Sequence, residues 1–275
     1  MKQVIEFCGL PGSGKTTLYE TFVGALSRLR PGTFGREAAV TACIRRRDDG
    51  LLKNVLKRFP PLVWKRFMGS EFALPELEAF VGARVGLLAH VSRALAERDV
   101  PARYAQVTLG AFFKNFAECE LVRRYLRPDE TFVMDEGNSH RAITLYGYLP
   151  APPPESEIRE YADLIPKPDV VFWTDADPAL CEARIATRGK KPYRRPFQLE
   201  DLALPERVRR LAPCRACIAV VADQLKVRGV DVIRIDTNGK QSETVAAAKT
   251  WAARMAGHTD PPRAGPADPK RRQRR

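Results

Sequence analysis

The stretch that decides the fold runs from Val4 to Leu26 and reads VIEFCGLPGSGKTTLYETFVGAL. Its first five residues are apolar or β-branched apart from one glutamate, which predicts a short strand ending at Gly9. From Leu18 onward the apolar residues recur at helical spacing, which predicts a helix. A glycine-rich turn lies between the two. A strand, a glycine-rich turn and a helix therefore open the chain.

This turn follows the pattern Gly-x-x-x-x-Gly-Lys-Thr from Gly9 to Thr16. Glycines let backbone N–H groups turn inward around phosphate oxygens, and the helix that follows adds the positive end of its dipole. The lysine can reach the β- and γ-phosphates of a nucleoside triphosphate, and the threonine hydroxyl can ligate Mg²⁺. We therefore expect ATP phosphates to be bound by Gly12, Ser13, Gly14, Lys15, Thr16 and Thr17.

The rest of the chain alternates strands with helices. Apolar runs predict strands over 131–134, 169–174 and 230–235, with a weaker one over 33–40. Helical spacing predicts helices over 75–97, 107–126, 177–188, 205–228 and 242–255, and a less regular helical pattern over 50–70. Strands separated by helices indicate a parallel sheet covered on both faces.

Adjacent acids at a strand end supply the expected metal site. A phosphate-binding loop needs a carboxylate from a neighbouring strand to hold magnesium, directly or through water, and Asp135 ends an apolar strand with Glu136 beside it. We expect Thr16 and Asp135 to position the metal. Asp175 and Asp177 end another strand in a similar way, but Asp177 precedes a proline and is explained as a helix cap.

A cluster of six cations between residues 184 and 195 separates two of the expected helices. A basic loop of this kind can fold over a bound triphosphate and exclude water, which helps another acceptor compete for the phosphoryl group. We expect a lid over 184–204, in which Arg184, Arg188 and Arg194 neutralise charge on the transferring group and Arg188 also contacts the nucleotide.

Composition is that of an ordinary globular protein. The chain has 275 residues, 44% of them hydrophobic and 29% charged, with a formal net charge of +13. Such a basic chain favours anionic partners, either phosphorylated small molecules or nucleic acid. The last 18 residues, 258–275, hold six lysines or arginines against two aspartates and few apolar residues, so we expect a disordered basic tail.

The sequence predicts neither a membrane segment nor a disulfide framework. No apolar run reaches 18 residues, and Glu6 interrupts the first apolar stretch where a signal peptide would need its core. The six cysteines are scattered, and Cys214 and Cys217 form a single C-x-x-C with no histidine nearby, which favours buried thiols over a zinc site. We expect a cytoplasmic protein.

Residues 3–256 resemble the nucleoside and nucleotide kinase group of P-loop proteins, and most of all the thymidylate kinases. The phosphate loop is similar to theirs, Phe34-Gly35-Arg36-Glu37 resembles their short Arg-Glu-Pro segment, and Asp135-Glu136-Gly137 stands where they carry Asp-Arg-Tyr. The run from Ala183 to Gly189 is similar to the arginine helix that enters their lid. The resemblance implies an α/β P-loop fold with a five-stranded parallel sheet, helices on both faces, and an acceptor held by the helices that lie between the second and third strands in the sequence.

We therefore expect one P-loop kinase domain over 1–257, with a helical acceptor-binding region over 41–130. It would move the γ-phosphoryl group of ATP, with Mg²⁺, to a small hydroxyl- or phosphate-bearing acceptor such as a nucleoside, nucleotide, sugar or antibiotic-like alcohol. Glu136 or Glu37 would orient or deprotonate an acceptor hydroxyl. The resemblance implies that Arg84 grips an acceptor phosphate. We expect His90 and His140 to be local hydrogen-bond partners.

Two alternatives stay open. A polynucleotide 5′-hydroxyl kinase fits the basic body and tail. An ATPase or switch without an acceptor fits the Asp135-Glu136 pair, because a glutamate there can polarise water. A signalling GTPase is excluded, since no guanine-reading Asn-Lys-x-Asp follows a strand. The sequence also leaves a homodimer open.

Overall fold

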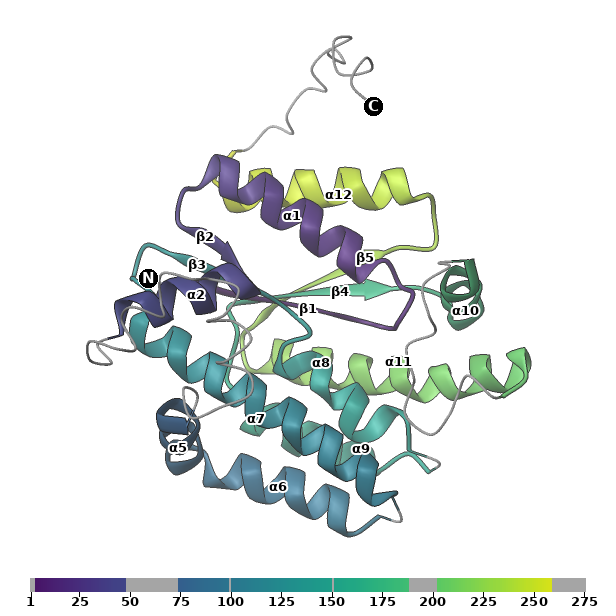
Figure 1. The fold of residues 1–275 in the computed structure, drawn as a ribbon. Coiled ribbons are helices and arrows are strands. Elements are labelled where there is room, and N and C mark those ends of the chain that lie inside the picture. The colour runs from purple at the N-terminus through teal and green to yellow at the C-terminus, as the bar shows by residue number, and fades with distance from the viewer. Residues whose placement is uncertain (1–2, 48–73, 99, 150, 188–201, 259–275) are drawn as a thin grey trace.

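A parallel β-sheet forms the centre of the molecule (Figure 1). The computed structural model describes residues 3–47, 74–98, 100–149, 151–187 and 202–258, and within them the sheet has five strands in the order β2-β3-β1-β4-β5. The strands are β1 (Gln3–Gly9), β2 (Thr33–Gly35), β3 (Thr131–Asp135), β4 (Val170–Asp175) and β5 (Asp231–Asp236). Every pairing between neighbours is parallel. The expected α/β class and five-stranded parallel sheet are confirmed.

Helices cover both faces of this sheet, above and below it in Figure 1. Their bounds are α1 (Lys15–Leu29), α2 (Arg36–Arg46), α5 (Leu74–Ala83), α6 (Val85–Ala96), α7 (Ala102–Tyr125), α8 (Asn138–Ala142), the π-helical turn η1 (Ile143–Gly147), α9 (Glu155–Leu164), α10 (Pro178–Thr187), α11 (Leu204–Val227) and α12 (Gln241–Met255). The helices α1 and α12 lie on one face, and α7, α8, α9 and α11 lie on the other.

The core is divided by the sheet. On the α1/α12 side, Phe7 of β1 stacks on Phe172 of β4 at 4.9 Å between ring centroids, with Phe22 of α1 edge-on at 5.4 Å. On the other side, Trp173 of β4 belongs to a larger cluster with the buried residues of α11 and η1. Because a parallel sheet has helices on both faces, its central strands are largely apolar on both sides, with the buried Glu6 of β1 as an exception.

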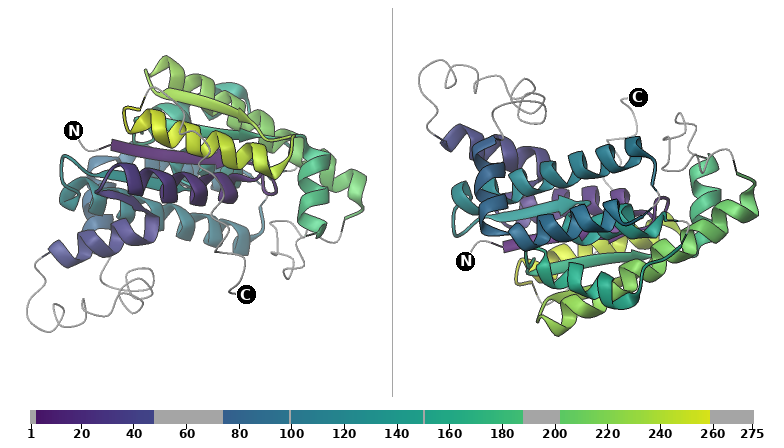
Figure 2. Two further views of the ribbon diagram at one scale, coloured as in Figure 1. Left: turned by 90° about the horizontal axis from the view of Figure 1, so that it is seen from above. Right: turned by 90° about the horizontal axis from the view of Figure 1, so that it is seen from below.

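The register of the strands places the phosphate-binding turn. Phe7 pairs with Asp135 of β3, and Gly9 pairs with Thr174 of β4. The chain therefore leaves β1 beside the carboxyl ends of both neighbouring strands, which is where open α/β sheets bind ligands. Figure 2 shows α10 lying beyond the same end of the sheet.

Two expected elements differ from those observed. The strand expected over 33–40 ends at Gly35, and the chain continues as α2 from Arg36, whose backbone N–H donates to the Tyr19 hydroxyl at 3.0 Å. The helix expected over 75–97 is two helices, α5 and α6, bent by 93° at Arg84. Glycines 82 and 86 flank that break and weaken a continuous helix. The helical pattern expected over 50–70 and the tail 258–275 fall largely outside the described residues.

Taken one at a time, the described helices are too short or too polar to cross a membrane. The bent pair α5 and α6 meets the length and composition requirement only when its two helices are taken together. Cys214 and Cys217 lie buried on α11, and no group of three or more metal-ligating side chains occurs among the described residues. The expected buried thiols are confirmed.

Candidate active site

The turn after β1 has the shape of a phosphate cradle. Gly12 and Gly14 both have φ of +84°, a conformation that favours glycine. A Cβ on Gly12 would lie 2.4 Å from the carbonyl oxygen of Cys181 on α10, so this position tolerates no side chain. A Cβ on Gly14 would project into open space, so it is the positive φ rather than crowding that favours glycine there.

The N-terminus of α1 opens onto this cradle. Gly14 is the N-cap residue, and no side chain caps the helix. The first N–H groups of a helix have no intrahelical acceptor, so those at the start of α1 are available to phosphate oxygens. Lys15 begins the helix with its side chain 7% exposed, while Thr16 is exposed. The cradle thus combines free amides, the helix dipole and an inward lysine.

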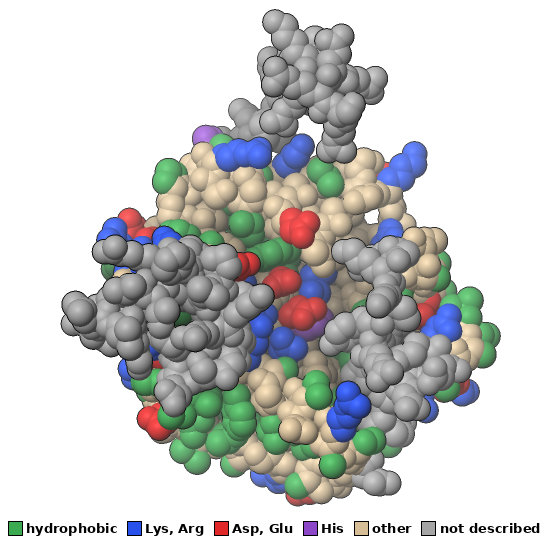
Figure 3. Space-filling model, viewed as in Figure 1, with side chains coloured by type: hydrophobic (Ala, Val, Ile, Leu, Met, Phe, Trp, Pro, Cys, Tyr) green, Lys and Arg blue, Asp and Glu red, His purple; other side chains and the backbone are tan. Residues whose placement is uncertain are grey.

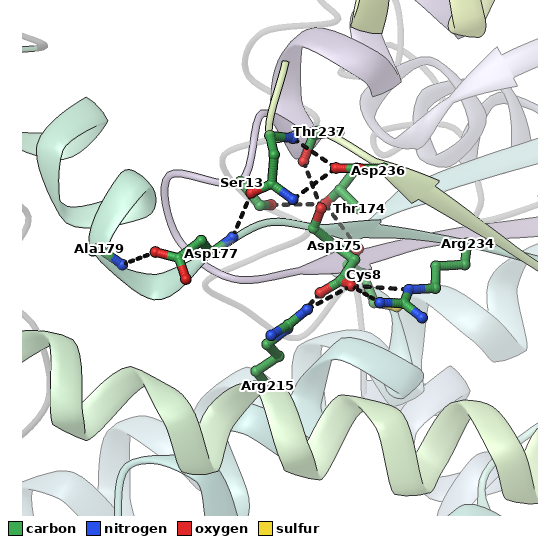
Figure 4. Close-up of polar contacts among 11 residues, drawn as sticks. Cys8, Ser13, Thr174, Asp175, Asp177, Ala179, Arg215, Arg234, Asp236 and Thr237 are labelled. Atoms are coloured by element: carbon green, nitrogen blue, oxygen red, sulfur yellow. Dashed lines mark hydrogen bonds and ion pairs between the residues drawn. The ribbon is translucent and has the colours of Figure 1, made fainter.

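The end of β4 anchors the cradle (Figure 4). The hydroxyls of Ser13 and Thr174 are hydrogen-bonded at 2.7 Å, and Thr174 donates to the Cys8 carbonyl at 3.1 Å. A Cβ on Gly9 would lie 2.0 Å from the Thr174 hydroxyl oxygen. These contacts fix the turn against the sheet.

Asp175 is a structural residue rather than a second metal ligand. Its carboxylate accepts two hydrogen bonds from Arg215 of α11, at 2.7 and 2.8 Å, and others from Arg234 of β5 (Figure 4). Burial would raise its pKa, but the two guanidinium groups outweigh burial and lower it. Asp177 accepts from the N–H groups of Ala179 and Leu180, which bears out the expected helix cap.

Asp135 and Thr16 fit a magnesium ion held with the help of phosphates. The Asp135 backbone carbonyl accepts from Arg36 at 3.1 Å, but its carboxylate makes no hydrogen bond or ion pair with other described residues. A free carboxylate and an exposed hydroxyl, with no surrounding cage of protein ligands, match the way Mg²⁺ binds through one or two side chains plus phosphate.

Glu136 joins the cradle to the next helix. Its Oε1 lies 3.1 Å from Nζ of Lys15 and 3.7 Å from Nε2 of His140, and its Oε2 lies 4.0 Å from a terminal nitrogen of Arg141. His140 and the ammonium of Lys15 hold the pKa of Glu136 well below its usual value. Burial and the Lys15 charge lower the pKa of His140 to about 3, so its ring is neutral at neutral pH. Figure 3 shows acidic, basic and histidine side chains gathered in a hollow in the middle of this face.

The backbone of Glu136 is strained and held in place. It is the only non-glycine residue of the described chain with positive φ, at +54°. Asn115 of α7 donates to its carbonyl at 3.2 Å, and Arg36 donates to the preceding carbonyl. A strained backbone conformation that is held in place by several surrounding contacts is typical of a functional site.

A buried network from α2 and α7 supports this strained turn. Arg36 donates to Glu118 at 2.8 Å and to the amide oxygen of Asn115 at 2.6 Å. The Glu118 side chain is fully buried, and burial raises its pKa despite the neighbouring Arg36. Burial, together with the Arg36 charge, lowers the pKa of Lys114 on α7. These residues form a charged wall beside Asp135 at the end of β3 and Glu136 just after it.

The structure brings together only part of the expected site. Lys15, Thr16, Asp135 and Glu136 lie at the cradle. Glu37 is exposed on α2 and makes no contact recorded among the described residues, while its neighbour Arg36 points into the site. His140 is a local partner of Glu136, as expected.

Two of the expected arginines, Arg84 and Arg184, make no recorded contact with Glu136. Arg184 on α10 donates to the Gly239 carbonyl at 3.0 Å, which joins α10 to the loop after β5. Arg84 is exposed at the α5/α6 break, over the Phe80 ring at 5.7 Å, and donates to the Leu164 carbonyl at 3.4 Å. Arg188 and Arg194 lie outside the described residues.

Sequence reasoning missed Arg36, Asn115, Glu118 and Arg141. Arg36 stands in the segment that resembles a family motif, but its contacts depend on the start of α2 at Arg36, where the sequence predicts a strand. Arg141 stands five residues beyond Glu136, close enough to have been weighed as a charge on the helix that follows the acidic pair. No motif or spacing in the sequence indicates that Asn115 or Glu118 belongs to the site.

Comparison with known proteins agrees with this geometry. The AAA_33 family model, described as an AAA domain, matches residues 4–214, which is more than half of the chain. The chain belongs to the AAA_33 family. No curated protein matches it.

The AAA_33 match contains the cradle, β3 with its two acids, β4 and the first half of α11. Membership and the geometry of the loop together make this chain a P-loop NTPase-like domain with a nucleotide-binding fold. The AAA_33 match does not extend to β5 and α12. The strand β5 completes the sheet, and the helix α12 covers one face of β1 and β4.

Proposed function

We propose that this AAA_33 protein is an ATP- and Mg²⁺-dependent phosphotransferase that acts on a small hydroxyl- or phosphate-bearing acceptor. The supporting observation is the strained Glu136, whose carboxylate lies 3.1 Å from the loop lysine while Arg36 and Asn115 grip its backbone. In P-loop proteins the loop lysine reaches the γ-phosphate. A carboxylate held beside that lysine is therefore placed to orient or deprotonate the acceptor group that attacks the γ-phosphate.

The donor side uses the cradle. Lys15 and the backbone of residues 12–16 bind the donor phosphates, and Thr16 and Asp135 hold the metal. When bound, Mg²⁺ neutralises charge on the β- and γ-phosphates. The acceptor oxygen forms a bond to the γ-phosphorus as the bond to the β,γ-bridging oxygen breaks and ADP leaves.

The acceptor side depends on the chemistry of the acceptor. A hydroxyl acceptor gives its proton to Glu136, with Glu37 as the second candidate base; an ionised phosphate acceptor has no proton to give. In this proposal the lid arginines Arg184, Arg188 and Arg194 neutralise charge on the transferring group.

An ADP-release screen tests the function. The full chain is incubated with MgATP alone and with nucleosides, nucleotides, sugars, aminoglycosides and 5′-hydroxyl oligonucleotides. We expect at least one small acceptor to raise ADP release well above the acceptor-free rate, and Lys15→Ala to abolish that increase while the protein stays folded. Turnover retained by Lys15→Ala would refute the assigned cradle.

The same screen separates the alternatives. Glu136 next to Asp135 also suits an ATPase that polarises water, and ADP release at full speed without an acceptor would support that function. A response to oligonucleotides alone would support a polynucleotide kinase, which the basic charge of the chain favours.

A further inference from the structure

Arg141 of α8 is a largely buried cation for which the described part of the chain supplies no hydrogen-bonded partner. Its side chain is 13% exposed, and its nearest recorded charge is Oε2 of Glu136 at 4.0 Å. Its Nε is buried without a hydrogen-bond partner, and the guanidinium donates no hydrogen bond recorded among the described residues. A guanidinium has five donors, and burying them unsatisfied is costly, so buried arginines are normally fully paired.

Nearby acids do not provide the missing partner. Glu136 is committed to Lys15, at 3.1 Å, and Glu118 is committed to Arg36, at 2.7 Å. Burial lowers the pKa of Arg141 despite the opposing charge of Glu136, the charge of Arg36 lowers it further, and Lys114 adds another cation to this wall. The surroundings of Arg141 therefore call for an additional negative charge.

Arg141 lies on the acceptor side of Glu136. One oxygen of that carboxylate faces Lys15 of the cradle, and the other faces Arg141. An anion bound by Arg141 is thus separated by Glu136 from phosphates bound by the loop. The position also differs from that of Arg84, which stacks on Phe80 at the α5/α6 break.

We propose that Arg141 binds an anionic group of the acceptor, so that the substrates of this enzyme are small molecules carrying a phosphate or a carboxylate rather than neutral alcohols. The inference rests on the proposed phosphotransferase function and deepens it. Planar guanidinium groups bind both oxyanions in a bidentate manner, so the two groups share one recognition chemistry.

A binding experiment tests the subsite without turnover. The full chain is saturated with Mg²⁺ and a non-hydrolysable ATP analogue and then titrated by calorimetry with inorganic phosphate and, separately, with acetate. We expect phosphate or acetate to bind while the donor site is filled. Arg141→Gln should weaken that binding by about 30-fold or more, as loss of one partner of a buried charge pair does, with the affinity for the ATP analogue unchanged.

Two controls keep the result interpretable. Arg28→Gln removes an exposed arginine at the end of α1 and should leave anion binding unchanged. Thermal unfolding of Arg141→Gln without ligand should match or exceed the wild type, because the substitution removes an uncompensated buried charge. Added phosphate should then stabilise the wild type and Arg28→Gln but not Arg141→Gln.

Three results would overturn the proposal. One is anion binding that survives in Arg141→Gln. Another is phosphate that binds only when the ATP analogue is absent and competes with it, because the anion would then occupy the donor cradle. The third is no anion binding at all to the protein with its donor site filled.

Rates of ADP release show whether the bound anion is a phosphate or a carboxylate of the acceptor. They also test the anion subsite independently of the proposed phosphotransferase function. ADP release is compared within matched pairs: a nucleoside and its monophosphate, a sugar and its phosphate, a sugar and its acid. We expect the anionic member to be preferred and Arg141→Gln to raise its KM far more than it lowers kcat. Equal use of neutral members would overturn the inference while supporting the function, whereas failure of the ATP analogue to bind would overturn the function itself.

Discussion

Glu136 carries the electrostatic link between the cradle and the helix that follows β3, so its protonation should be visible in stability. Its folded-state pKa lies below the ordinary value of 4.5, held there by the charges of His140 and Lys15. Because the pKa of His140 is about 3, its ring is charged only near that pH, and Lys15 provides the stabilising charge at higher pH. The stabilisation is therefore fully present above pH 4.5 and is lost as the pH falls through the folded pKa.

Glu136→Gln should accordingly lower the free energy of unfolding at pH 7 by about 1 kcal/mol, a modest amount because the side chain is 43% exposed. The difference from wild type should shrink as the pH falls from 5 to 3.5, measured by urea denaturation at each pH. Glu37→Gln is the matched control, since that exposed glutamate has no recorded contact among the described residues. A difference that stays constant across this range would show that the ion pair with Lys15 contributes nothing.

Asp135 offers a second test at the level of one residue. Its carboxylate is free of recorded contacts within the described chain, so Asp135→Asn should leave stability almost unchanged. It should raise the Mg²⁺ concentration needed for half-maximal phosphoryl transfer by about 10-fold or more. Initial rates over a magnesium series at saturating ATP measure this, with Asp231→Asn at the opposite end of the sheet as control. An unchanged magnesium requirement would remove Asp135 from the metal site.

Local patterns predicted the donor half of the site and not its supporting wall. Lys15 and Thr16 belong to one contiguous motif, and Asp135 ends an apolar run. Each of the three can therefore be picked out from the residues next to it in the sequence. Arg36, in contrast, reaches its partners Asn115 and Glu118 across about 80 residues of sequence. Such a network exists only once α2 and α7 pack together, which no spacing rule within one segment reports.

At the scale of elements, the helix α8 is set in place by a buried carboxylate from the central strand. Glu6 of β1 accepts from the backbone N–H of Asn138 at 3.2 Å and from the N–H and hydroxyl of Ser139 at 2.9 and 2.6 Å. Burial raises its pKa despite these bonds. Gly137 makes room for the arrangement, because a Cβ there would lie 2.3 Å from the Glu6 carboxyl carbon.

Gly137→Ala should therefore destabilise the fold through this clash, by about 1–3 kcal/mol as for other overpacked sites. Gly24→Ala is the matched control: it lies inside α1 with nothing near its Cβ, so it should instead stabilise by about 0.5–1 kcal/mol. Urea unfolding measures both. Combining Gly137→Ala with Glu6→Ala should cost less than the sum of the single changes, and strict additivity would contradict the clash as the cause.

Elements with strong periodicity were predictable, and elements decided by tertiary contacts were not. The strands β3, β4 and β5 and the helices α11 and α12 fall within about one residue of their expected bounds. The strand prediction over 33–40 is wrong beyond Gly35, where the contacts of Arg36 and the burial of Ala39 and Val40 against β3 and α7 favour a helix. The α5/α6 bend at Arg84 lies inside an unbroken apolar pattern, so periodicity alone predicts one helix.

At the scale of the whole molecule, charged groups from several segments lie at one end of the parallel sheet. The chain as a whole is strongly basic. All five described strands run the same way, so Gly9, Asp135 and Thr174 meet at the same edge although they lie far apart in sequence. Arg36 and Arg141 then add positive charge next to this edge. With a formal net charge of +13, the field of the protein should raise the local concentration of anions before any contact forms.

This field predicts how salt affects catalysis. For an anionic small acceptor, kcat/KM should fall several-fold as ionic strength rises from about 0.05 to 0.5 M, because the Debye length shrinks to a few ångströms and attraction over longer distances is screened. A neutral acceptor of the same size is the control and should show little change, and ADP-release assays in NaCl series at saturating MgATP measure both. A polynucleotide acceptor would give a much steeper dependence, since each contacted phosphate releases counterions. A flat salt profile for every anionic acceptor would mean that the basic surface plays no part in substrate capture, and that recognition depends only on groups that touch the ligand.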